Sequence, residues 1–301
     1  MSGTVRVGRE VSRALAGSGA VVALETSVIG QGLPHPRNLE CVERMAGAIR
    51  DEGAVPAWIG VVDGAVVVGL TDAELARFAE PGHATKVARR DLPIAAATGA
   101  LGATTVSATI WAAAHAGVAV GVTGGIGGVH PGADPDVSAD LLELARTPGL
   151  LVCSGPKSII DPAATAEKLE ELGVALVGYG VDRLPFFLAR EAPVELEHRA
   201  GTAADAAGML RAAAGLGTSS TLIVCNPVPA EHAMDAGEVA VASAEAERRA
   251  DAAGIRGKAR TPFLLAALAD LTDGRSLEAN LALLEENARV AGAIASTLGH
   301  T

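Results

Sequence analysis

Short apolar runs alternate with amphipathic stretches along most of this 301-residue chain. Runs rich in Val, Leu and Ile predict buried β-strands, and apolar residues spaced three and four apart predict helices that bury one face. The predicted strands lie in 21–25, 56–70, 118–124, 150–155, 175–180 and 221–227. The predicted helices lie in 38–53, near 105–116, after Ser138, around 163–172, near 202–214, and over 235–253, 262–272 and 276–298.

Turn and cap residues sharpen several of these boundaries. The pair Asp63-Gly64 predicts a tight turn that divides 56–70 into two strands. Asn38 stands where a helix cap belongs, before a helical pattern that ends at Gly53. The spacing of Thr71 and Glu74 predicts a capping box at the start of a short helix. The polar segment 81–93 is predicted to be a loop.

The segment from Leu92 to Ala133 contains no Asp, Glu, Lys or Arg, so it is long enough to be tested as a membrane span. Its composition is dominated by Ala, Gly and Thr, whereas spanning helices rely on Leu, Ile and Phe. We therefore interpret it as a buried helix, a buried strand and a glycine-rich loop.

The alternation of strands and helices predicts an α/β fold with a central, mostly parallel or mixed sheet and helices on both faces. No Ser/Pro-rich linker or internal repeat divides the chain, so residues 1–301 are predicted to form a single domain. In such sheets ligands bind beyond the carboxyl ends of the strands. Four unusual features fall at those ends: Glu25, the glycine loop that begins at Gly124, Lys157 and Asn226.

Composition narrows the possible partners. The formal net charge of −11 argues against a nucleic-acid surface, which needs clustered Lys and Arg. Cys41, Cys153 and Cys225 are far apart and lie in apolar runs, which favours buried free thiols and a reducing cytoplasm. The first residues show no apolar core of a signal peptide, so a cytoplasmic location is expected.

Glu25 and Lys157 are the main candidates for chemistry, and each has a plain alternative. Glu25 would either cap backbone amides of its own loop or exchange a proton with a substrate. Lys157 follows Gly155-Pro156 on what would be a rigid turn, where an amine in apolar surroundings can attack a carbonyl or imine carbon. A surface or salt-bridge role for Lys157 stays open at this point.

Three further motifs carry weaker signals. The glycines of 124–128 would either bring backbone amides close to an anion or simply make a tight turn. Asp136 and Asp140 would share a helix face if a helix began at Asp136, where they would either bind a hard cation such as Mn²⁺ or Mg²⁺ or favour the helix dipole. The basic residues Lys86, Arg89 and Arg90 would form a phosphate pocket or ordinary surface charge.

Taken together and in order, nine motifs resemble those of the pseudouridine-5′-phosphate glycosidase family, which is related to the indigoidine synthase A-like proteins. The resemblance covers roughly residues 8–298. The motifs are ALETSVIGQGLPHPRN, GHATKVARRDLP, GATTVSATI, VTGGIGGVH, DVSADLLELA, VCSGPKSIID, NPVP, GKARTPFLL and SLEANLALLEENA.

This resemblance implies a three-layer α/β/α fold, a homotrimer and reversible cleavage of the C–C glycosidic bond of pseudouridine 5′-phosphate to uracil and ribose 5-phosphate. It implies that Glu25 is the proton donor and Lys157 the nucleophile that forms an imine or iminium with the sugar. It further implies Asp136 as a ligand of one Mn²⁺ ion per subunit. The implied substrate-binding residues are Lys86, Val106, Ser138, Ala139 and Asp140, with His130 near the phosphate and Asn280 near the base.

Two departures from the family pattern are visible. Gln31 stands where a titratable His is expected, and the segment from His130 to Asp136 looks short, which bears on the metal environment. Two alternatives therefore stay open: a lysine-imine enzyme acting on another phosphosugar, as in a pigment pathway, and a catalytically silent ligand-binding relative.

Overall fold

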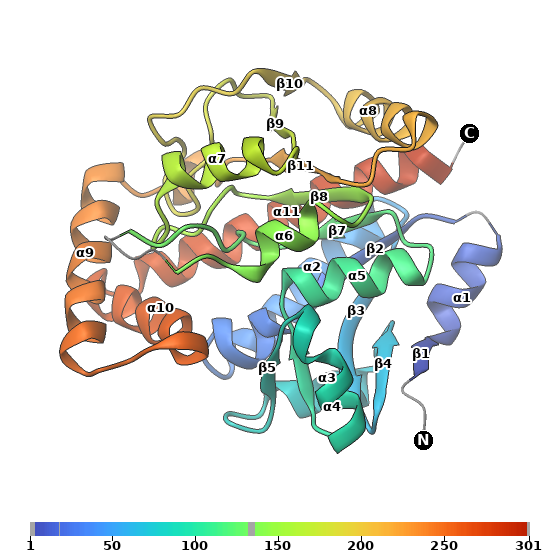
Figure 1. Cartoon of the computed structure of the whole chain (residues 1–301), viewed down its shortest axis with the longest axis horizontal. Coiled ribbons are helices and arrows are strands. Elements are labelled where there is room, and N and C mark those ends of the chain that lie inside the picture. Colours follow the sequence, from blue (N-terminus) through green and yellow to red (C-terminus); the bar gives the residue numbers. More distant parts are fainter. Residues whose placement is uncertain (1–3, 18, 132–135, 300–301) are drawn as a thin grey trace.

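A computed structural model describes residues 4–17, 19–131 and 136–299. Its centre is an eleven-stranded sheet with helices on both faces, which confirms the predicted three-layer α/β/α fold (Figure 1). The main path of the sheet runs in the order β1-β4-β3-β2-β7-β8-β11-β9-β10, and the short strands β6 and β5 branch from β3. The strands are β1 (Thr4–Val7), β2 (Val21–Glu25), β3 (Val55–Val62), β4 (Ala65–Val68), β5 (Thr85–Val87), β6 (Gly102–Thr104), β7 (Val120–Val122), β8 (Gly149–Cys153), β9 (Leu176–Tyr179), β10 (His198–Ala200) and β11 (Thr221–Cys225).

Most strand pairs are parallel, so the sheet is mixed only where β3 meets its neighbours. The hairpin of β3 and β4 is antiparallel and pairs Val62 with Ala65 around the predicted turn. Strand β6 is also antiparallel to β3. It pairs with Gly60 and Val61, directly after β2 has ended opposite Ile59. This change of neighbour at the end of β2 positions the candidate site.

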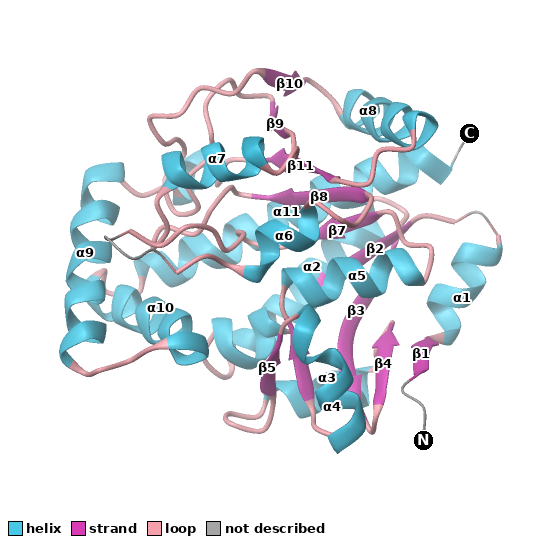
Figure 2. Cartoon of the chain, in the orientation of Figure 1, coloured by secondary structure: helices cyan, strands magenta, loops and turns pink. Residues whose placement is uncertain are grey.

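The helices form two layers, one on each face of the sheet. Figure 2 shows them around the sheet. One layer packs on Val22 and Leu24 of β2, and the other packs on Val21 and Ala23, as expected when successive side chains of a strand point to opposite faces. The first layer contains α2 (Arg37–Asp51), α3 (Asp72–Ala79), α8 (Ala203–Leu216) and α11 (Arg275–Gly299). The second contains α1 (Arg9–Ala16), α4 (Leu92–Thr98), α5 (Val106–His115), α6 (Ala139–Leu144) and α7 (Pro162–Glu171).

Two further helices, α9 (Ala236–Ala252) and α10 (Arg260–Leu271), pack against each other at one end of the sheet. They share an apolar cluster with Ile159 and Ile160, which follow Lys157 in the chain. Helix α10 therefore lies close to the loops at the carboxyl ends of the strands.

Most predicted elements are confirmed, including the capping box of Thr71 and Glu74 and the cap of α6 by Ser138. The interpretation of Asn38 as a cap is wrong, because α2 begins at Arg37 and its cap position is Pro36. Segment 81–93 is not only a loop, because it contains β5. The short strands β1, β5, β6 and β10 lack the apolar run that marks the short strand β7, since their sequences are TVRV, TKV, GAT and HRA.

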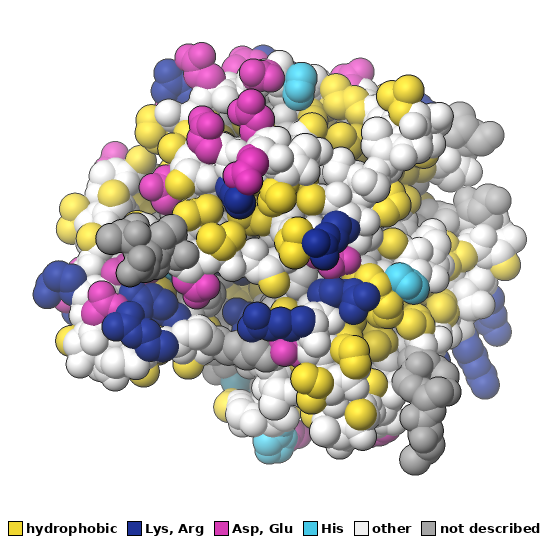
Figure 3. All heavy atoms as spheres, in the orientation of Figure 1, with side chains coloured by type: hydrophobic (Ala, Val, Ile, Leu, Met, Phe, Trp, Pro, Cys, Tyr) yellow, Lys and Arg dark blue, Asp and Glu magenta, His cyan; other side chains and the backbone are white. Residues whose placement is uncertain are grey.

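Two other expectations concern a membrane span and a nucleic-acid surface. Within the described ranges, no helix is both long and apolar enough to cross a membrane, and the uncharged segment contains the buried helix α5 and strand β7. On the face shown in Figure 3, Lys and Arg side chains lie among acidic and apolar ones and do not form one continuous basic surface.

Candidate active site

Glu25 is positioned by the point at which β2 gives way to β6. The Ile59 carbonyl accepts hydrogen bonds from the hydroxyls of Thr26, at 2.7 Å, and Thr104, at 2.6 Å. The Thr26 hydroxyl oxygen also accepts a hydrogen bond from the Thr104 amide at 3.0 Å. All three residues are buried. The two threonines therefore fasten the end of β2 to β3 and β6, and Glu25 lies directly before this junction.

The Glu25 carboxylate is buried, with 5% of the residue exposed, and both of its oxygens accept a hydrogen bond. Ser27 donates to Oε2 at 2.6 Å, and Thr123, which follows β7, donates to Oε1 through a short contact. A buried carboxylate needs such donors, because an unpaired charge in a protein interior is costly. The two donors fix the orientation of the carboxylate, and neither was singled out from the sequence.

Asn287 lies behind this carboxylate, on the buried face of α11. Its Nδ2 donates to the Thr123 carbonyl and to the Ser154 hydroxyl, both at 3.0 Å, and its Oδ1 accepts from Asn226 Nδ2 at 3.0 Å. Asn287 is fully buried, so the network joins the ends of β7, β8 and β11 in the interior. Asn226, proposed from its place at a strand end, thus belongs to the support of the site.

Lys157 follows β8 on a turn held by backbone hydrogen bonds from its own amide to Ile126, at 3.1 Å, and from Ile160 to its carbonyl, at 2.9 Å. Gly155 in this turn has a φ of +75° and lies so close to the Pro185 carbonyl that a Cβ would approach that oxygen to 2.0 Å. Among the described residues, the Lys157 side chain has no carboxylate partner. The described residues therefore give no support to the alternative that Lys157 forms a salt bridge.

One cavity of about 40 Å³ brings four predicted site residues together. Glu25 lies at the end of β2, Lys157 after β8, Lys86 on β5 and Asn280 on α11, and all four line this cavity. Thr261, Pro262 and Leu265 of α10 line it as well. Segments that lie far apart in the sequence therefore enclose a carboxylate and an amine in one space.

The glycine loop after β7 contributes close packing. The Gly127 amide donates to Asp140 Oδ2 at 3.1 Å, and the Val129 amide donates to the Thr165 hydroxyl at 3.0 Å. A Cβ on Gly127 would meet the Ser138 hydroxyl at 2.4 Å. These two amides are already hydrogen-bonded within the protein, so of the two interpretations of the loop, a tight turn fits them better than an anion nest.

Asp140 ties this loop to the start of α5. Its carboxylate is buried and accepts from the Ser107 amide at 3.0 Å as well as from Gly127. The amino-terminal turns of α5 and α6, which carry the predicted residues Val106, Ser138, Ala139 and Asp140, are thereby held together. The condition under which Asp136 and Asp140 would share a helix face is not met, because α6 begins only at Ala139.

The three basic residues of 86–90 separate in the structure. Lys86 lines the same cavity as Glu25 and Lys157, whereas the Arg89 guanidinium lies over the Trp111 ring, 4.3 Å from its centroid. Arg90 is largely exposed beside Asp91. Of the three, only Lys86 is placed to bind a ligand in this cavity.

The charges of four residues act on the pKa of His130: Lys86, Asp136, Glu247 and Arg260. Its side chain is 16% exposed, and its Nδ1 lies 3.9 Å from Glu247 Oε1. Both atoms are buried and have no hydrogen-bond partner among the described residues. Burial lowers the pKa of His130 below its ordinary value of 6.5, and Arg260 and Lys86 lower it further, against the opposing effect of Glu247 and Asp136.

The described residues offer limited ligands for a metal. Asp136 is exposed, and its carbonyl accepts the His130 amide at 2.9 Å. In the part of the chain that the structure describes, no three His, Cys, Asp or Glu side chains cluster as a metal site. A hard cation bound at one carboxylate keeps most of its ligands as water, which suits Mg²⁺ or Mn²⁺. Most of the short segment 130–136 lies outside the described residues.

Fold and cavity together define an α/β protein whose site, at the carboxyl ends of parallel strands, contains a buried carboxylate and a lysine amine. Residues 10–297 match the family described as indigoidine synthase A like protein, and the chain belongs to this family. The resemblance inferred from the nine motifs is thus confirmed.

Relatives and solved structures cover nearly the whole chain. A protein of Sorangium cellulosum named pseudouridine-5′-phosphate glycosidase is 45% identical over 295 residues, 97% of this chain and 93% of its own. A protein of the same name from Symbiobacterium thermophilum is 47% identical and covers 96% of each chain. An indigoidine synthase A-like protein of Thermotoga maritima has a TM-score of 0.90 and 38% identity, over 99% of this chain and 97% of that one. The prealnumycin C-glycosynthase AlnA, solved with ribulose 5-phosphate, has the same TM-score and coverage and 40% identity.

The lowered pKa of His130 predicts a specific pH dependence of stability. As the pH falls below 6.5, the unfolded chain binds a proton at this residue before the folded protein does, so the free energy of unfolding decreases until the lowered folded pKa is reached. We expect His130→Gln to lose less unfolding free energy than the unmodified protein between about pH 7 and pH 5. Urea unfolding at several pH values measures this, and identical pH dependences of the two proteins would contradict it.

Proposed function

We propose that this protein is a pseudouridine-5′-phosphate glycosidase, which reversibly cleaves the C–C glycosidic bond of pseudouridine 5′-phosphate to uracil and ribose 5-phosphate. The observation that carries the proposal is the enclosure of Glu25, Lys157, Lys86 and Asn280 in one cavity. The names of relatives that are 45% and 47% identical over almost the whole chain support it.

The proposed reaction uses Lys157 as a nucleophile and Glu25 as an acid. Glu25 donates a proton to the ring oxygen while the Lys157 amine bonds to the anomeric carbon, and the ring C–O bond breaks. The attached nitrogen loses a proton to the Glu25 carboxylate and then donates its electron pair, so that the C–C bond breaks and an iminium forms. Glu25 passes the proton taken from nitrogen to carbon 5 of uracil, which leaves, and water hydrolyses the iminium to ribose 5-phosphate and the free amine.

The carbon–carbon bond explains why these residue types are needed. Water cannot displace the base directly, since an electron source at the anomeric carbon is required to break this bond. Arg cannot replace Lys157, because a guanidinium stays protonated and is not a nucleophile. Asp would place its acid one methylene short of the position that Glu25 takes, and proton transfer tolerates little displacement.

Substrate binding is proposed to divide between two ends of the cavity. Lys86 binds the phosphate with His130 close by, together with the amino-terminal turns of α5 and α6 at Val106 and at Ser138, Ala139 and Asp140. Both Asp140 oxygens already accept backbone amides, so we infer that its carboxylate holds these turns in place. Asn280, whose Oδ1 is buried and has no partner among the described residues, binds the base.

We further propose that Asp136 holds one Mn²⁺ ion, largely through water, and that the metal supplies positive charge near the phosphate. The chain is proposed to act as a single domain, 1–301, within a homotrimer in the cytoplasm. Three buried free cysteines suit a reducing compartment. The net charge of −11 supports a small-molecule substrate rather than a nucleic acid.

A second candidate is a lysine-imine enzyme acting on another phosphosugar, as in a pigment pathway. It is favoured by the likeness to a C-glycosynthase that was solved with ribulose 5-phosphate. A catalytically silent relative is disfavoured, because Glu25 and Lys157 both line the cavity. Incubating the protein with pseudouridine 5′-phosphate and Mn²⁺ and measuring free uracil distinguishes the glycosidase from the other two.

Lys157 is expected to form the covalent adduct. Borohydride added during reaction with ribose 5-phosphate and uracil should attach a reduced ribose phosphate to Lys157, as detected by mass spectrometry of peptides. Lys157→Ala should fold but lose turnover by more than the ~10²–10⁴-fold typical of losing acid–base help alone. Lys168→Ala, at an exposed lysine paired with Glu171, is the matched control and should react like the unmodified protein. Retention of about a hundredth of the activity by Lys157→Ala would contradict the mechanism.

Thr123 is expected to position the Glu25 carboxylate. Thr123→Val keeps the shape but removes the donor, and a hydrogen bond to a charged group contributes roughly 1.5–3 kcal/mol, so kcat should fall about tenfold to a hundredfold with little change in KM. Thr123→Ser should restore kcat. Thr221→Val, at a buried threonine that bonds the Thr147 carbonyl at the opposite end of the strands, is the control and should leave kcat unchanged. A rise in KM with kcat unchanged would argue against a positioning role for Thr123.

Metal dependence follows from the single carboxylate at Asp136. We expect Asp136→Ala to lower activity in a way that added Mn²⁺ partly restores, because one carboxylate among waters is a weak anchor. Titrating Mn²⁺ into metal-stripped protein and into the variant measures the shift in half-saturation. Full activity of the unmodified protein in a chelator would rule out the metal.

A further inference from the structure

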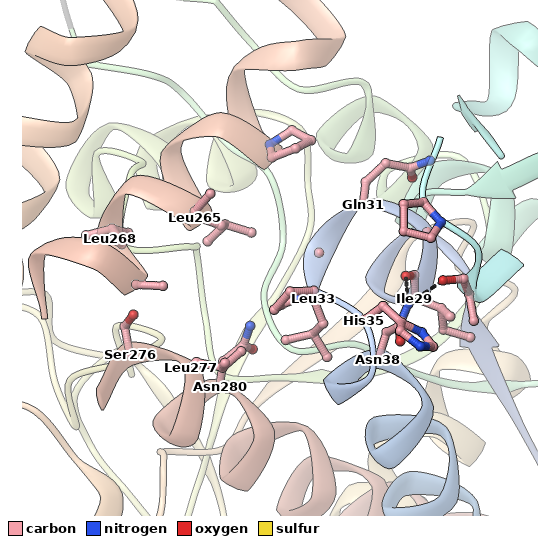
Figure 4. A pocket seen from close by; sticks show the side chains of 18 of the residues that line it. Ile29, Gln31, Leu33, His35, Asn38, Leu265, Leu268, Ser276, Leu277 and Asn280 are labelled. Atoms are coloured by element: carbon pink, nitrogen blue, oxygen red, sulfur yellow. Dashed lines mark hydrogen bonds between the residues drawn. The ribbon is translucent and has the colours of Figure 1, made fainter. Parts of the chain in front are cut away.

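A cleft of about 560 Å³ opens beside the catalytic cavity of about 40 Å³. Figure 4 shows it between two walls: the π-helical turn Val28–Gly32 with the start of α2 on one side, and α10 with the start of α11 on the other. Both spaces are lined by the same six residues, so they adjoin each other at these residues. These residues are Gln31, Gly32, Phe187, Pro262, Leu265 and Asn280.

The walls of the cleft are largely apolar, with polar groups at the junction. Ile29, Leu33 and Leu268 are buried side chains that line it. At the junction, Gln31 Oε1 and Asn280 Oδ1 are buried and have no hydrogen-bond partner among the described residues. Apolar walls with a few polar groups are typical of sites for small organic molecules.

The wall formed by Val28–Gly32 is held in place by Asn38. The Asn38 side-chain amide donates to the Ile29 carbonyl at 3.1 Å and to the Ala79 carbonyl at 3.0 Å, and both bonds appear in Figure 4. Gln31 Nε2 donates to the Ala84 carbonyl at 2.9 Å. These three hydrogen bonds hold the turn in place as one wall of the cleft.

The cleft lies beside the proposed binding position of the base and away from that of the phosphate. Lys86, proposed to bind the phosphate, lines the catalytic cavity but is not a lining residue of the cleft, whereas Asn280, proposed to bind the base, lines both. A base held at Asn280 therefore has the cleft on its side away from the phosphate. A cavity of roughly 150 Å³ lined by Leu, Ile and Phe already admits benzene, and this cleft is larger.

We propose that the cleft receives an apolar substituent on the base, so that the substrates include C-linked ribonucleotides whose base is larger than uracil. This inference rests on the proposed glycosidase function and extends its substrate class. The ring nitrogens of a C5-linked uracil are the positions from which such a substituent can project, because the sugar occupies carbon 5. The bond that breaks, and the proton that carbon 5 gains, are those of the parent reaction.

The test compares pseudouridine 5′-phosphate with its N1-benzyl and N3-benzyl derivatives, measuring release of the free base by chromatography. For at least one derivative we expect kcat/KM of no less than about a hundredth of the parent value. Leu277→Trp, which adds bulk at a residue that lines only the cleft, should lower kcat/KM for that derivative at least about tenfold more than for the parent. Val241→Trp, at an exposed position of α9, is the control and should change neither.

The outcomes separate the two proposals. If the parent nucleotide is not cleaved, the proposed function is wrong and this inference falls with it. If the parent is cleaved but both derivatives fall below about a hundredth of its kcat/KM, the cleft does not receive substituents and only this inference is overturned. Equal losses for parent and derivative in Leu277→Trp would overturn it as well.

Discussion

The rest of the site depends on how a carboxylate is kept in the protein interior. Glu25 is almost fully buried, so its two oxygens must find donors, and the donors come from Ser27 and from Thr123 at the end of a neighbouring strand. Thr123 is held in turn by Asn287, whose side chain also bonds Ser154. Each strand end is therefore fixed relative to the next by a polar contact, and this explains how loops distant in sequence can enclose a small cavity with defined geometry.

Much of the fold could be predicted from the sequence, because strong apolar runs and caps are local signals. The run 21–25 and the box of Thr71 and Glu74 need no information from elsewhere in the chain. The strands β5 (TKV) and β6 (GAT) carry no such signal, since they are strands only because β6 pairs with β3 and β5 pairs with β6. Asn38 was misread for a similar reason: its side chain bonds carbonyls of two other segments instead of its own helix start.

The residues of the candidate site also divide into those that the sequence could indicate and those that it could not. Glu25 and Lys157 could be found because they stand at predicted strand ends. The family resemblance selected Lys86 from its basic cluster and added Asn280, and both line the same cavity. Thr123 follows an apolar strand and looks like a satisfied core residue, and Asn287, after Glu286, looks like part of a solvated helix face, until their partners are known. Arg89 shows the reverse error, since its charge suggested a ligand but it packs on Trp111.

Helix α11 carries two of these residues, Asn280 at the cleft and Asn287 behind the acid, seven positions apart and thus two turns along one face. One helix therefore carries both the residue that we propose to bind the base and the residue that supports the donor of the Glu25 carboxylate. A change that rotates or shifts this helix to admit a different ligand also moves the support of the acid. Divergence of ligand preference within this architecture is accordingly easiest through side-chain exchange on the opposing wall, Val28–Gly32, where volume can change while the helix stays in register.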